Sequence, residues 1–261
     1  MSNSKPRAVS FDEASAFVLG GTSGIGLAVA RSLQDKGVRQ IMLAARSSER
    51  GKAAIEALRG PAEIQFFSCD AMDATSVSNG VAAAEAAFGA VDIAVSATTA
   101  ESMLALVGNM GMRDIELGLT GIALPPMHLA KAVLAGMKSR GGGVIISIAS
   151  DAAKVPTPGE AVIGAAMAAI TMFSRTLAME AKRDGIRVNV VTPSLVTGTG
   201  SEQRILASPF AARVFAKAAE KAALGLPDAA EIAELVTYLA SPATARLTGQ
   251  VVSLNGGISA A

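Results

Sequence analysis

Two hydrophobic patterns alternate along the chain. Short apolar runs rich in Val, Ile, Leu and Ala predict strands, and longer segments with apolar residues at helical spacing predict helices. The expected strands are residues 16–20, 40–45, 64–68, 93–96, 144–148, 188–192 and 251–254. The expected helices are residues 25–36, 49–58, 75–88, 111–137, 162–183 and 228–240. This alternation is typical of βαβ units, so we expect an α/β fold with a parallel sheet covered by helices on both faces.

The alternation continues without a long linker or a repeat, which predicts a single domain. We expect a loose leader at residues 1–15 and the domain itself at residues 16–261. Residues 197–226 form the longest segment outside the alternation of strands and helices. Long excursions from a sheet often cover a binding site, so we expect this segment to be a substrate lid.

Composition and charge give no reason to expect a membrane protein, a nucleic-acid-binding protein or a disulfide-stabilised protein. Hydrophobic residues make up 51% of the chain and charged residues 17%, and no uninterrupted apolar run reaches the length of roughly 18 residues that a membrane helix needs. The best candidate, residues 161–173, is therefore expected to be a buried or subunit-interface helix. A net charge of +1 gives no electrostatic reason to expect nucleic acid or a membrane as a partner. The only cysteine, Cys69, excludes an intrachain disulfide. Acidic Asp12 and Glu13 stand where a signal peptide would be apolar, so we expect a cytoplasmic protein.

A glycine-rich turn follows the first predicted strand and opens the first helix. Gly20, Gly24 and Gly26 have the spacing G-x-x-x-G-x-G. Glycines at a strand–helix junction let backbone N–H groups approach a pyrophosphate, and the helix N-terminus favours its negative charge. We therefore expect a dinucleotide to bind here, in contact with the glycines and with the residues between them, Thr22, Ser23 and Ile25. The alternative is a turn that only packs the strand against the helix.

The end of the second strand bears on the choice of cofactor. An acidic residue there would bind the 2′-hydroxyl of NAD, whereas an arginine can bind the 2′-phosphate of NADP. Ala45 carries no carboxylate and Arg46 follows it directly. We expect NADP rather than NAD, with a surface arginine of no special role as the alternative.

The glycine turn and several later segments together resemble the short-chain dehydrogenase/reductase family, from about residue 16 to residue 258. Residues 185–189 (GIRVN), 248–250 (TGQ) and 255–257 (NGG) match its signatures, with Asn255 where Asp is usual. The resemblance implies a doubly wound Rossmann-type domain with about seven parallel strands. It also implies a homodimer or homotetramer formed through two long helices, here about residues 111–137 and 162–183. Further cofactor contacts implied by the resemblance are Asp70, Ala71, Ser96, Pro193, Ser194, Val196 and Thr197, with Ser194 in place of a glycine.

The same resemblance implies that this chain lacks most of the side chains that the family uses for catalysis. In the family a serine steadies the substrate carbonyl, a tyrosine transfers the proton, a lysine lowers the tyrosine pKa, and an asparagine anchors a water relay. Ser150 falls on the serine position, but Ile163 and Met167 occupy those of tyrosine and lysine, and Gly118 that of asparagine. Ile163 and Met167 lie four residues apart on one predicted helix, so they should form an apolar wall.

Three other side chains are candidates to replace the missing groups. Lys154 could turn toward the pocket, but a solvated loop lysine is the plainer interpretation. Glu160 could edge the pocket, with an ordinary carboxylate at a helix start as the favoured alternative. His128, the only histidine, is expected to pack between helices. Thr98 and Thr99 are expected to line the pocket without a chemical role.

The expected lid has two faces. Its apolar residues are Phe210, Val214 and Phe215, and its basic residues are Arg213, Lys217 and Lys221. The apolar face suits a hydrophobic substrate and the basic face a phosphate-bearing carrier, although an amphipathic helix with solvated lysines is the favoured interpretation.

The residues thus favour an atypical NADP(H)-dependent oxidoreductase acting on a small carbonyl or alcohol substrate, with no metal. One alternative is a catalytically inactive cofactor-binding or scaffold subunit that pairs with an active paralogue. A weaker alternative is non-redox chemistry, such as elimination or isomerisation, in the altered pocket.

Overall fold

A computed structural model describes residues 10–99 and 104–261, and its centre is one seven-stranded sheet. The strand order is β3-β2-β1-β4-β5-β6-β7, and every neighbouring pair is parallel. The strands are β1 (Ser15–Leu19), β2 (Gln40–Ala45), β3 (Glu63–Ser68), β4 (Ile93–Ser96), β5 (Gly143–Ile148), β6 (Ile186–Pro193) and β7 (Val251–Leu254). The predicted doubly wound α/β domain is confirmed.

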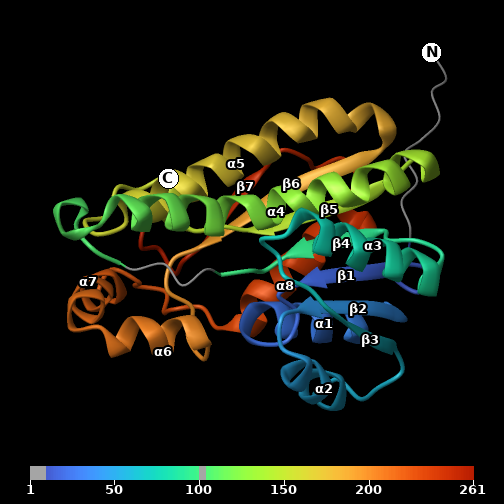
Figure 1. Cartoon of the computed structure of the whole chain (residues 1–261), viewed down its shortest axis with the longest axis horizontal. Coiled ribbons are helices and arrows are strands. Elements are labelled where there is room, and N and C mark those ends of the chain that lie inside the picture. Colours follow the sequence, from blue (N-terminus) through green and yellow to red (C-terminus); the bar gives the residue numbers. More distant parts are fainter. Residues whose placement is uncertain (1–9, 100–103) are drawn as a thin grey trace.

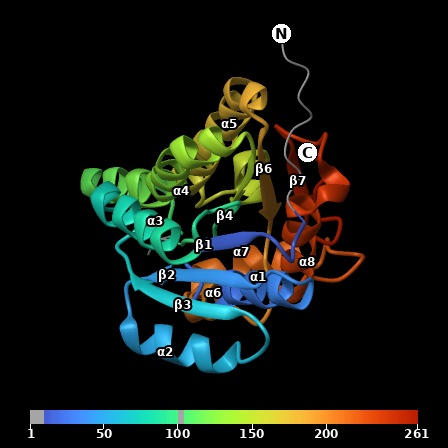
Figure 2. The ribbon, with the colours of Figure 1, turned by 90° about the vertical axis from the view of Figure 1, so that its right-hand side faces the viewer.

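The α-helices of the described chain are α1 (Gly24–Asp35), α2 (Ser48–Ala57), α3 (Ala74–Phe88), α4 (Met112–Arg140), α5 (Ala161–Ala181), α6 (Gly200–Ala207), α7 (Pro209–Ala219) and α8 (Ala229–Ala240), and six of them form two layers around the sheet. Helices α3, α4 and α5 cover one face, whereas α1, α2 and α8 cover the other (Figures 1 and 2). Side chains of β1 alternate between the two cores, because Ala16 and Val18 join one and Phe17 and Leu19 the other.

The strand order reverses direction beside β1. The chain first runs outward through β2 and β3, then returns to place β4 on the other side of β1. In open α/β sheets a crevice forms at the carboxyl ends of the strands at such a switch point, and ligands bind there. The glycine-rich turn follows β1 directly, so it lies at this point.

Residues 197–226 leave the sheet after β6 and contain α6 and α7, which lie outside the two helical layers at one end of the molecule (Figure 1). Thr197 and Asp228 form an isolated parallel bridge, so the two ends of this excursion meet. Of the expected leader, residues 1–9 lie outside the described part of the chain, and Ser15 already belongs to β1.

Helices α4 and α5 are the two longest helices of the described chain, and α4 continues three residues beyond its predicted end, to Arg140. By length and composition alone each is long and apolar enough to cross a membrane, although neither contains an uninterrupted apolar run of that length. Isolated charged residues interrupt the apolar runs without ending the helices, which is why a search for unbroken runs missed them. Both helices pack against the sheet. Within α4, 39% of the most apolar 18-residue stretch is buried inside the chain, and the value for Ala161–Asp184, which includes α5, is 33%.

Candidate functional site

The glycine-rich turn is built by close backbone contacts. Gly20 has a φ of +83°, and a Cβ atom on it would lie 2.6 Å from the carbonyl oxygen of Ala97. A Cβ atom on Gly26 would collide with the carbonyl oxygen of Gly20. Gly24 differs, because its φ is +52° and only atoms of Thr199 lie near its Cβ position, at 3.8 Å. Packing therefore explains Gly20 and Gly26, whereas Gly24 lies on the open side of the turn.

The N-terminus of α1 is available to a ligand. Ser23 stands at the N-cap position but makes no side-chain capping hydrogen bond, and no acidic residue lies in the first turn. Uncapped N–H groups and the helix dipole attract an anion. Together with the open side at Gly24, this arrangement fits the pyrophosphate of a dinucleotide. Thr22 is buried beneath the turn, and Ile25 and Gly26 continue the first helical turn.

The other residues expected to bind the cofactor follow neighbouring strands. Arg46 is exposed after β2, and Asp70 is exposed after β3, beside Ala71. One carboxylate oxygen of Asp70 accepts the Met72 N–H at 3.0 Å, which fixes the turn. Ser96 ends β4, with its Oγ 3.4 Å from the Oγ1 of Thr98. Because β1 to β4 are adjacent and parallel, these groups lie along one edge of the sheet.

The segment after β6 turns back toward the glycine-rich turn. Pro193 and Val196 are buried and Ser194 is partly buried. The Thr197 N–H donates to the carbonyl of Pro227 at 3.0 Å. Thr199, which the sequence analysis did not select, caps α6 and is the residue that approaches Gly24. Thr199 lies two residues after Thr197, which was expected to bind the cofactor, and this proximity in sequence was the available signal for it.

Ser150 lies just beyond β5, where a short 3-10 turn, Asp151–Ala153, begins. Its Oγ accepts the Ala152 N–H at 3.2 Å. A Cβ atom on Gly164 would lie 2.8 Å from the carbonyl oxygen of Ala152. The turn that carries Ser150 therefore packs directly against the first turn of α5, beside Ile163.

Hydrocarbon fills the face of α5 that meets this turn. Ile163 is 9% exposed and belongs to a cluster with Ala149 of the Ser150 loop, and Met167 packs against the same cluster. The only tyrosine of the chain, Tyr238, is 57% exposed on α8, on the opposite face of the sheet. It therefore cannot stand in for a tyrosine at position 163.

The space beside Gly118 is also filled. A Cβ atom on Gly118 would lie 2.9 Å from the Cγ1 of Val162. A larger side chain at position 118 would have to displace this methyl group. The two long helices α4 and α5 thus close the place where the family resemblance puts an asparagine.

Lys154 is not a solvated loop lysine, so that interpretation was wrong. Its side chain is 18% exposed and its Nζ lies 3.5 Å from the Asp151 carboxylate, itself 6% exposed. The Lys154 Nζ also donates to the Oγ of Ser253 on β7. These contacts hold the ammonium group in a buried network and do not leave it free to turn toward Ser150.

The same network ties the Ser150 loop to the end of the chain. Ser253 Oγ donates to Asp151 at 2.8 Å, and Ser259 Oγ donates to it at 3.1 Å. The Asn255 amide donates to the same carboxylate. An aspartate at position 255 would instead bring a second negative charge to Asp151, which gives a physical reason for the asparagine. Sequence reasoning missed Asp151, because its partners lie about a hundred residues away.

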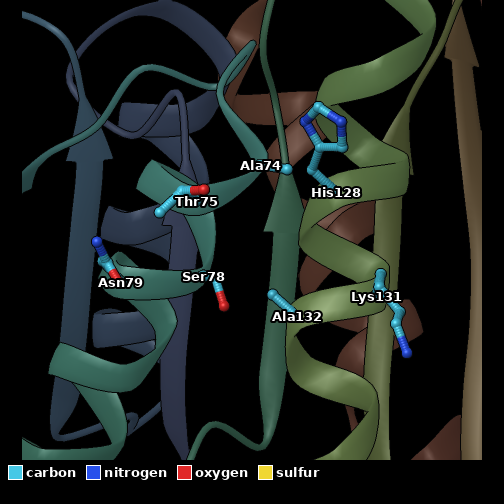
Figure 3. A pocket seen from close by; sticks show the side chains of 7 residues that line it. All are labelled: Ala74, Thr75, Ser78, Asn79, His128, Lys131 and Ala132. Atoms are coloured by element: carbon cyan, nitrogen blue, oxygen red, sulfur yellow. The ribbon is translucent and has the colours of Figure 1, made fainter.

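His128 lies where α4 faces α3. Its Nδ1 is 3.2 Å from the Ala71 carbonyl oxygen, as expected for a packing histidine. A pocket of about 390 Å³ separates the two helices there. Figure 3 shows its lining residues, Ala74, Thr75, Ser78, Asn79, His128, Lys131 and Ala132. None of these lining residues is among those expected to bind the cofactor, although the Ala71 carbonyl lies beside His128.

Helix α7 covers the start of α5. Gly159 has a φ of +92°, and a Cβ atom on it would lie 2.7 Å from the Phe210 ring and 3.3 Å from the Leu104 Cδ2. Phe215 is buried and Val214 partly buried, whereas Arg213, Lys217 and Lys221 are exposed. The apolar face of the helix therefore points into the molecule and its basic face points to solvent.

The burial of Glu160, next to Gly159, has an electrostatic effect. Burial raises the pKa of the Glu160 carboxyl, and a hydrogen bond with the Thr157 side chain offsets part of this rise. Burial likewise raises the pKa of the Cys69 thiol, which lies in the core between the sheet and α3.

Comparison with known proteins agrees with this geometry. A family model described as "Enoyl-(Acyl carrier protein) reductase" matches residues 20–259. The chain is 32% identical to the 3-oxoacyl-[acyl-carrier-protein] reductase FabG of Escherichia coli over 253 residues, which cover 96% of this chain and 99% of the relative. It is 30% identical over 259 residues to 2-(S)-hydroxypropyl-CoM dehydrogenase 3 of Xanthobacter autotrophicus, covering 93% and 95% of the two chains.

The chain belongs to the short-chain dehydrogenase/reductase family. Its structure also resembles an NADPH-bound short-chain oxidoreductase from Pseudomonas aeruginosa PAO1 that contains an atypical catalytic center. That likeness has a TM-score of 0.86 and 29% sequence identity, and covers 98% of this chain and all of the other. A dehydrogenase/reductase from Mycobacterium ulcerans, at a TM-score of 0.87 and 23% identity over 96% of this chain and 91% of its own, shares the fold.

Proposed function

We propose that this short-chain dehydrogenase/reductase binds NADP(H) and acts on a carbonyl or alcohol group with an active site that lacks the usual tyrosine and lysine. One observation carries the proposal. The glycine-rich turn, with the uncapped N-terminus of α1, lies at the switch point of the sheet, whereas α5 presents Ile163 and Met167 beside the Ser150 loop. The cofactor half of the site is present and the proton-transferring half is replaced by hydrocarbon.

The expected preference for NADP rests on Arg46. The arginine is exposed at the end of β2, and Ala45 beside it offers no carboxylate for a ribose hydroxyl. A guanidinium group in this position suits a 2′-phosphate. The NADPH bound by the similar P. aeruginosa oxidoreductase supports the same preference. When bound, the nicotinamide would supply or accept a hydride.

Residues of this chain would bind the substrate and exclude water from the site. The Ser150 hydroxyl would donate a hydrogen bond to the substrate oxygen. Ile163 and Met167 would exclude water from that oxygen, but they have no proton to give. The segment 197–226 would act as the lid, with Phe210 and Phe215 turned inward to meet an apolar substrate. Because several relatives are 3-oxoacyl reductases, a 3-oxoacyl thioester is the first substrate to try.

The exposed apolar side chains on α4 and α5 support self-association. Leu117 and Leu119 are 54% and 40% exposed on α4, and Met172 and Met179 are 60% and 59% exposed on α5. Two such helices pairing with those of a second copy would cover these side chains, giving a homodimer or homotetramer. A cytoplasmic location remains a prediction.

A titration of the purified protein with NADPH and, separately, with NADH tests the proposal through nicotinamide fluorescence. We expect NADPH to bind with a Kd on the order of micromolar, about −8 kcal/mol, and NADH to bind more weakly. Reduction of the N-acetylcysteamine thioester of acetoacetate, followed by loss of NADPH absorbance, then tests the reaction. Failure to bind either nucleotide would contradict the proposal and leave the inactive-subunit alternative.

A further inference from the structure

Glu160 shares a helix face with the two hydrocarbon replacements. Glu160, Ile163 and Met167 have the spacing i, i+3, i+7, which aligns side chains along one side of a helix. The Glu160 carbonyl already accepts the Gly164 N–H at 2.6 Å, so this residue lies within the helical hydrogen-bond pattern. It is the only titratable side chain of residues 160–174. The face that has lost its tyrosine and lysine therefore still carries one acid, a single turn away.

The carboxyl group of Glu160 does not cap its helix. A carboxylate at an N-cap position usually accepts hydrogen bonds from the first N–H groups of the helix. Glu160 occupies the N-cap position of α5 but makes no side-chain capping hydrogen bond, so the favoured interpretation of an ordinary helix-start carboxylate does not describe it. Its hydrogen-bonding partner is the Thr157 side chain in the preceding loop.

Glu160 is partly buried, and neighbouring segments pack around the residue that precedes it. Phe210 of α7 and Leu104 press against Gly159, and the Ala105 N–H donates to the Gly159 carbonyl at 3.0 Å. Glu160 is thus held where the expected lid, the loop at residues 104–105 and α5 meet. Desolvation of this kind disfavours the carboxylate form of an acid.

In the part of the chain that the structure describes, the charged groups around Glu160 do not oppose that effect. Within residues 10–99 and 104–261, Glu160 forms no ion pair. The charged residues of the surrounding elements are otherwise engaged or exposed: Lys154 is bound by Asp151, and Arg213 and Lys217 of α7 point to solvent. The protonated carboxylic acid therefore persists to a higher pH than in an ordinary glutamate.

We propose that Glu160 is the catalytic acid that replaces the missing tyrosine. In reduction, the O–H bond of the Glu160 carboxyl breaks and its proton goes to the substrate carbonyl oxygen, which becomes a hydroxyl. The carbonyl carbon would receive its hydride from NADPH held at the glycine-rich turn, with NADP⁺ as the oxidised product. The carboxylate left on Glu160 regains a proton from water. This inference rests on the proposed function, since it needs a carbonyl substrate and NADPH.

Two substitutions of Glu160 test the proposal in the full chain. Glu160→Gln keeps the shape but removes the acid, and Glu160→Asp keeps the acid but shortens its reach. Glu180→Gln, an exposed carboxyl near the other end of α5, is the matched control. With the acetoacetyl thioester we expect Glu160→Gln to lower kcat roughly 10²–10⁴-fold, the usual contribution of a positioned acid. Glu160→Asp should retain part of the rate, and Glu180→Gln all of it. The Kd for NADPH should stay unchanged in all three variants.

The pH dependence gives two further readouts. The wild-type rate should fall as pH rises through the pKa of Glu160, and the residual rate of Glu160→Gln should show no such fall. Urea unfolding of the cofactor-free protein gives the second readout. Because the folded-state pKa lies above the unfolded one, the folded state binds this proton more tightly. Wild-type stability should therefore decrease as pH rises from the unfolded pKa to the folded pKa, a decrease that Glu160→Gln lacks.

The outcomes separate the two proposals. Wild-type turnover that Glu160→Gln matches would overturn the role of Glu160 and leave the proposed function intact. A wild-type protein that binds NADPH but reduces neither the thioester nor simple ketones would overturn the role of Glu160 and confine the proposed function to cofactor binding. A protein that binds neither nucleotide would overturn both.

Discussion

The Cγ1 of Val162 lies 2.9 Å from the point that a Cβ atom on Gly118 would occupy. These residues belong to different long helices, α5 and α4, and Val162 immediately precedes Ile163. The helical turn that carries Ile163, where the family resemblance puts a tyrosine, therefore also fills the space beside Gly118, where the resemblance puts an asparagine. The two positions that depart from the family pattern therefore lie beside one packing contact between α4 and α5.

This contact makes Gly118→Asn a destabilising change. Overpacking of a well-filled site costs about 1–3 kcal/mol, and we expect a loss of that size in urea unfolding. Val162→Ala removes the opposing methyl group, so the double variant should lose less stability than the two single changes added together. Strictly additive losses would show that the two side chains do not meet.

Restoring the usual chemical groups should restore the usual reaction. In a Glu160→Gln background, which lacks the proposed acid, we expect Ile163→Tyr combined with Met167→Lys to raise ketone reduction by roughly 10²–10⁴-fold, because a positioned acid–base group contributes that much. Adding Ser150→Ala should remove most of the gain, which identifies the serine loop as its partner. No gain in a folded, NADPH-binding variant would mean that the pocket has changed beyond these two positions.

Gly20 can be tested against a glycine of similar backbone conformation. Gly20 and Gly141 have φ values of +83° and +72°, but only a Cβ atom on Gly20 would meet other atoms, those of Ala97 and Thr98. Each Gly→Ala change carries the cost of a left-handed residue, about 1–2 kcal/mol. We expect Gly20→Ala also to abolish NADPH binding in the fluorescence titration, whereas Gly141→Ala keeps it. Equal affinities would mean that the turn does not bind the nucleotide.

Arg46 should set the preference between the two nucleotides. A hydrogen bond to a charged group contributes about 1.5–3 kcal/mol, so Arg46→Ala should raise the Kd for NADPH by roughly 10- to 100-fold. The Kd for NADH should hardly change, because NADH lacks the 2′-phosphate. Arg50→Ala, an exposed arginine on α2, is the control. Parallel weakening of both nucleotides would assign Arg46 a structural role instead.

The buried pair of Asp151 and Lys154 should be essential for stability. Removing one member of a buried ion pair costs about 3–5 kcal/mol, because the other charge is left unpaired. We expect Asp151→Ala to lose about that amount in urea unfolding. Glu56→Ala breaks an ion pair with Arg59 in which both side chains are more than half exposed, and such pairs contribute about 1 kcal/mol or less. Similar losses for both variants would contradict the burial argument.

The sheet and its helices could be predicted because their signals are local. Strands buried on both faces appear as continuous apolar runs, and β1 and β5 needed no information from the rest of the chain. The glycine-rich turn was equally visible, since its residues are adjacent in sequence. The apolar character of positions 163 and 167 could also be read directly.

The long-range contacts could not be predicted in this way. Nothing near Asp151 in the sequence indicates that Asn255 and Ser259 will donate to it, or that Lys154 will be held there. Nor does the sequence indicate that Phe210, fifty positions further along the chain, packs against Gly159, the neighbour of Glu160. Residues joined only by tertiary packing leave no periodic signal, so their environments became visible only in the structure.

The bond from the Thr197 N–H to the Pro227 carbonyl closes the base of the 197–226 excursion. Since the chain leaves and re-enters the fold at nearly one point, the length of the intervening segment is of little consequence to the sheet, and the entropy of closing a loop grows slowly with its length. Evolution can therefore lengthen, shorten or replace this segment as a module. Grafting it onto another member of the family should be possible at this junction, with the nucleotide-binding half left undisturbed.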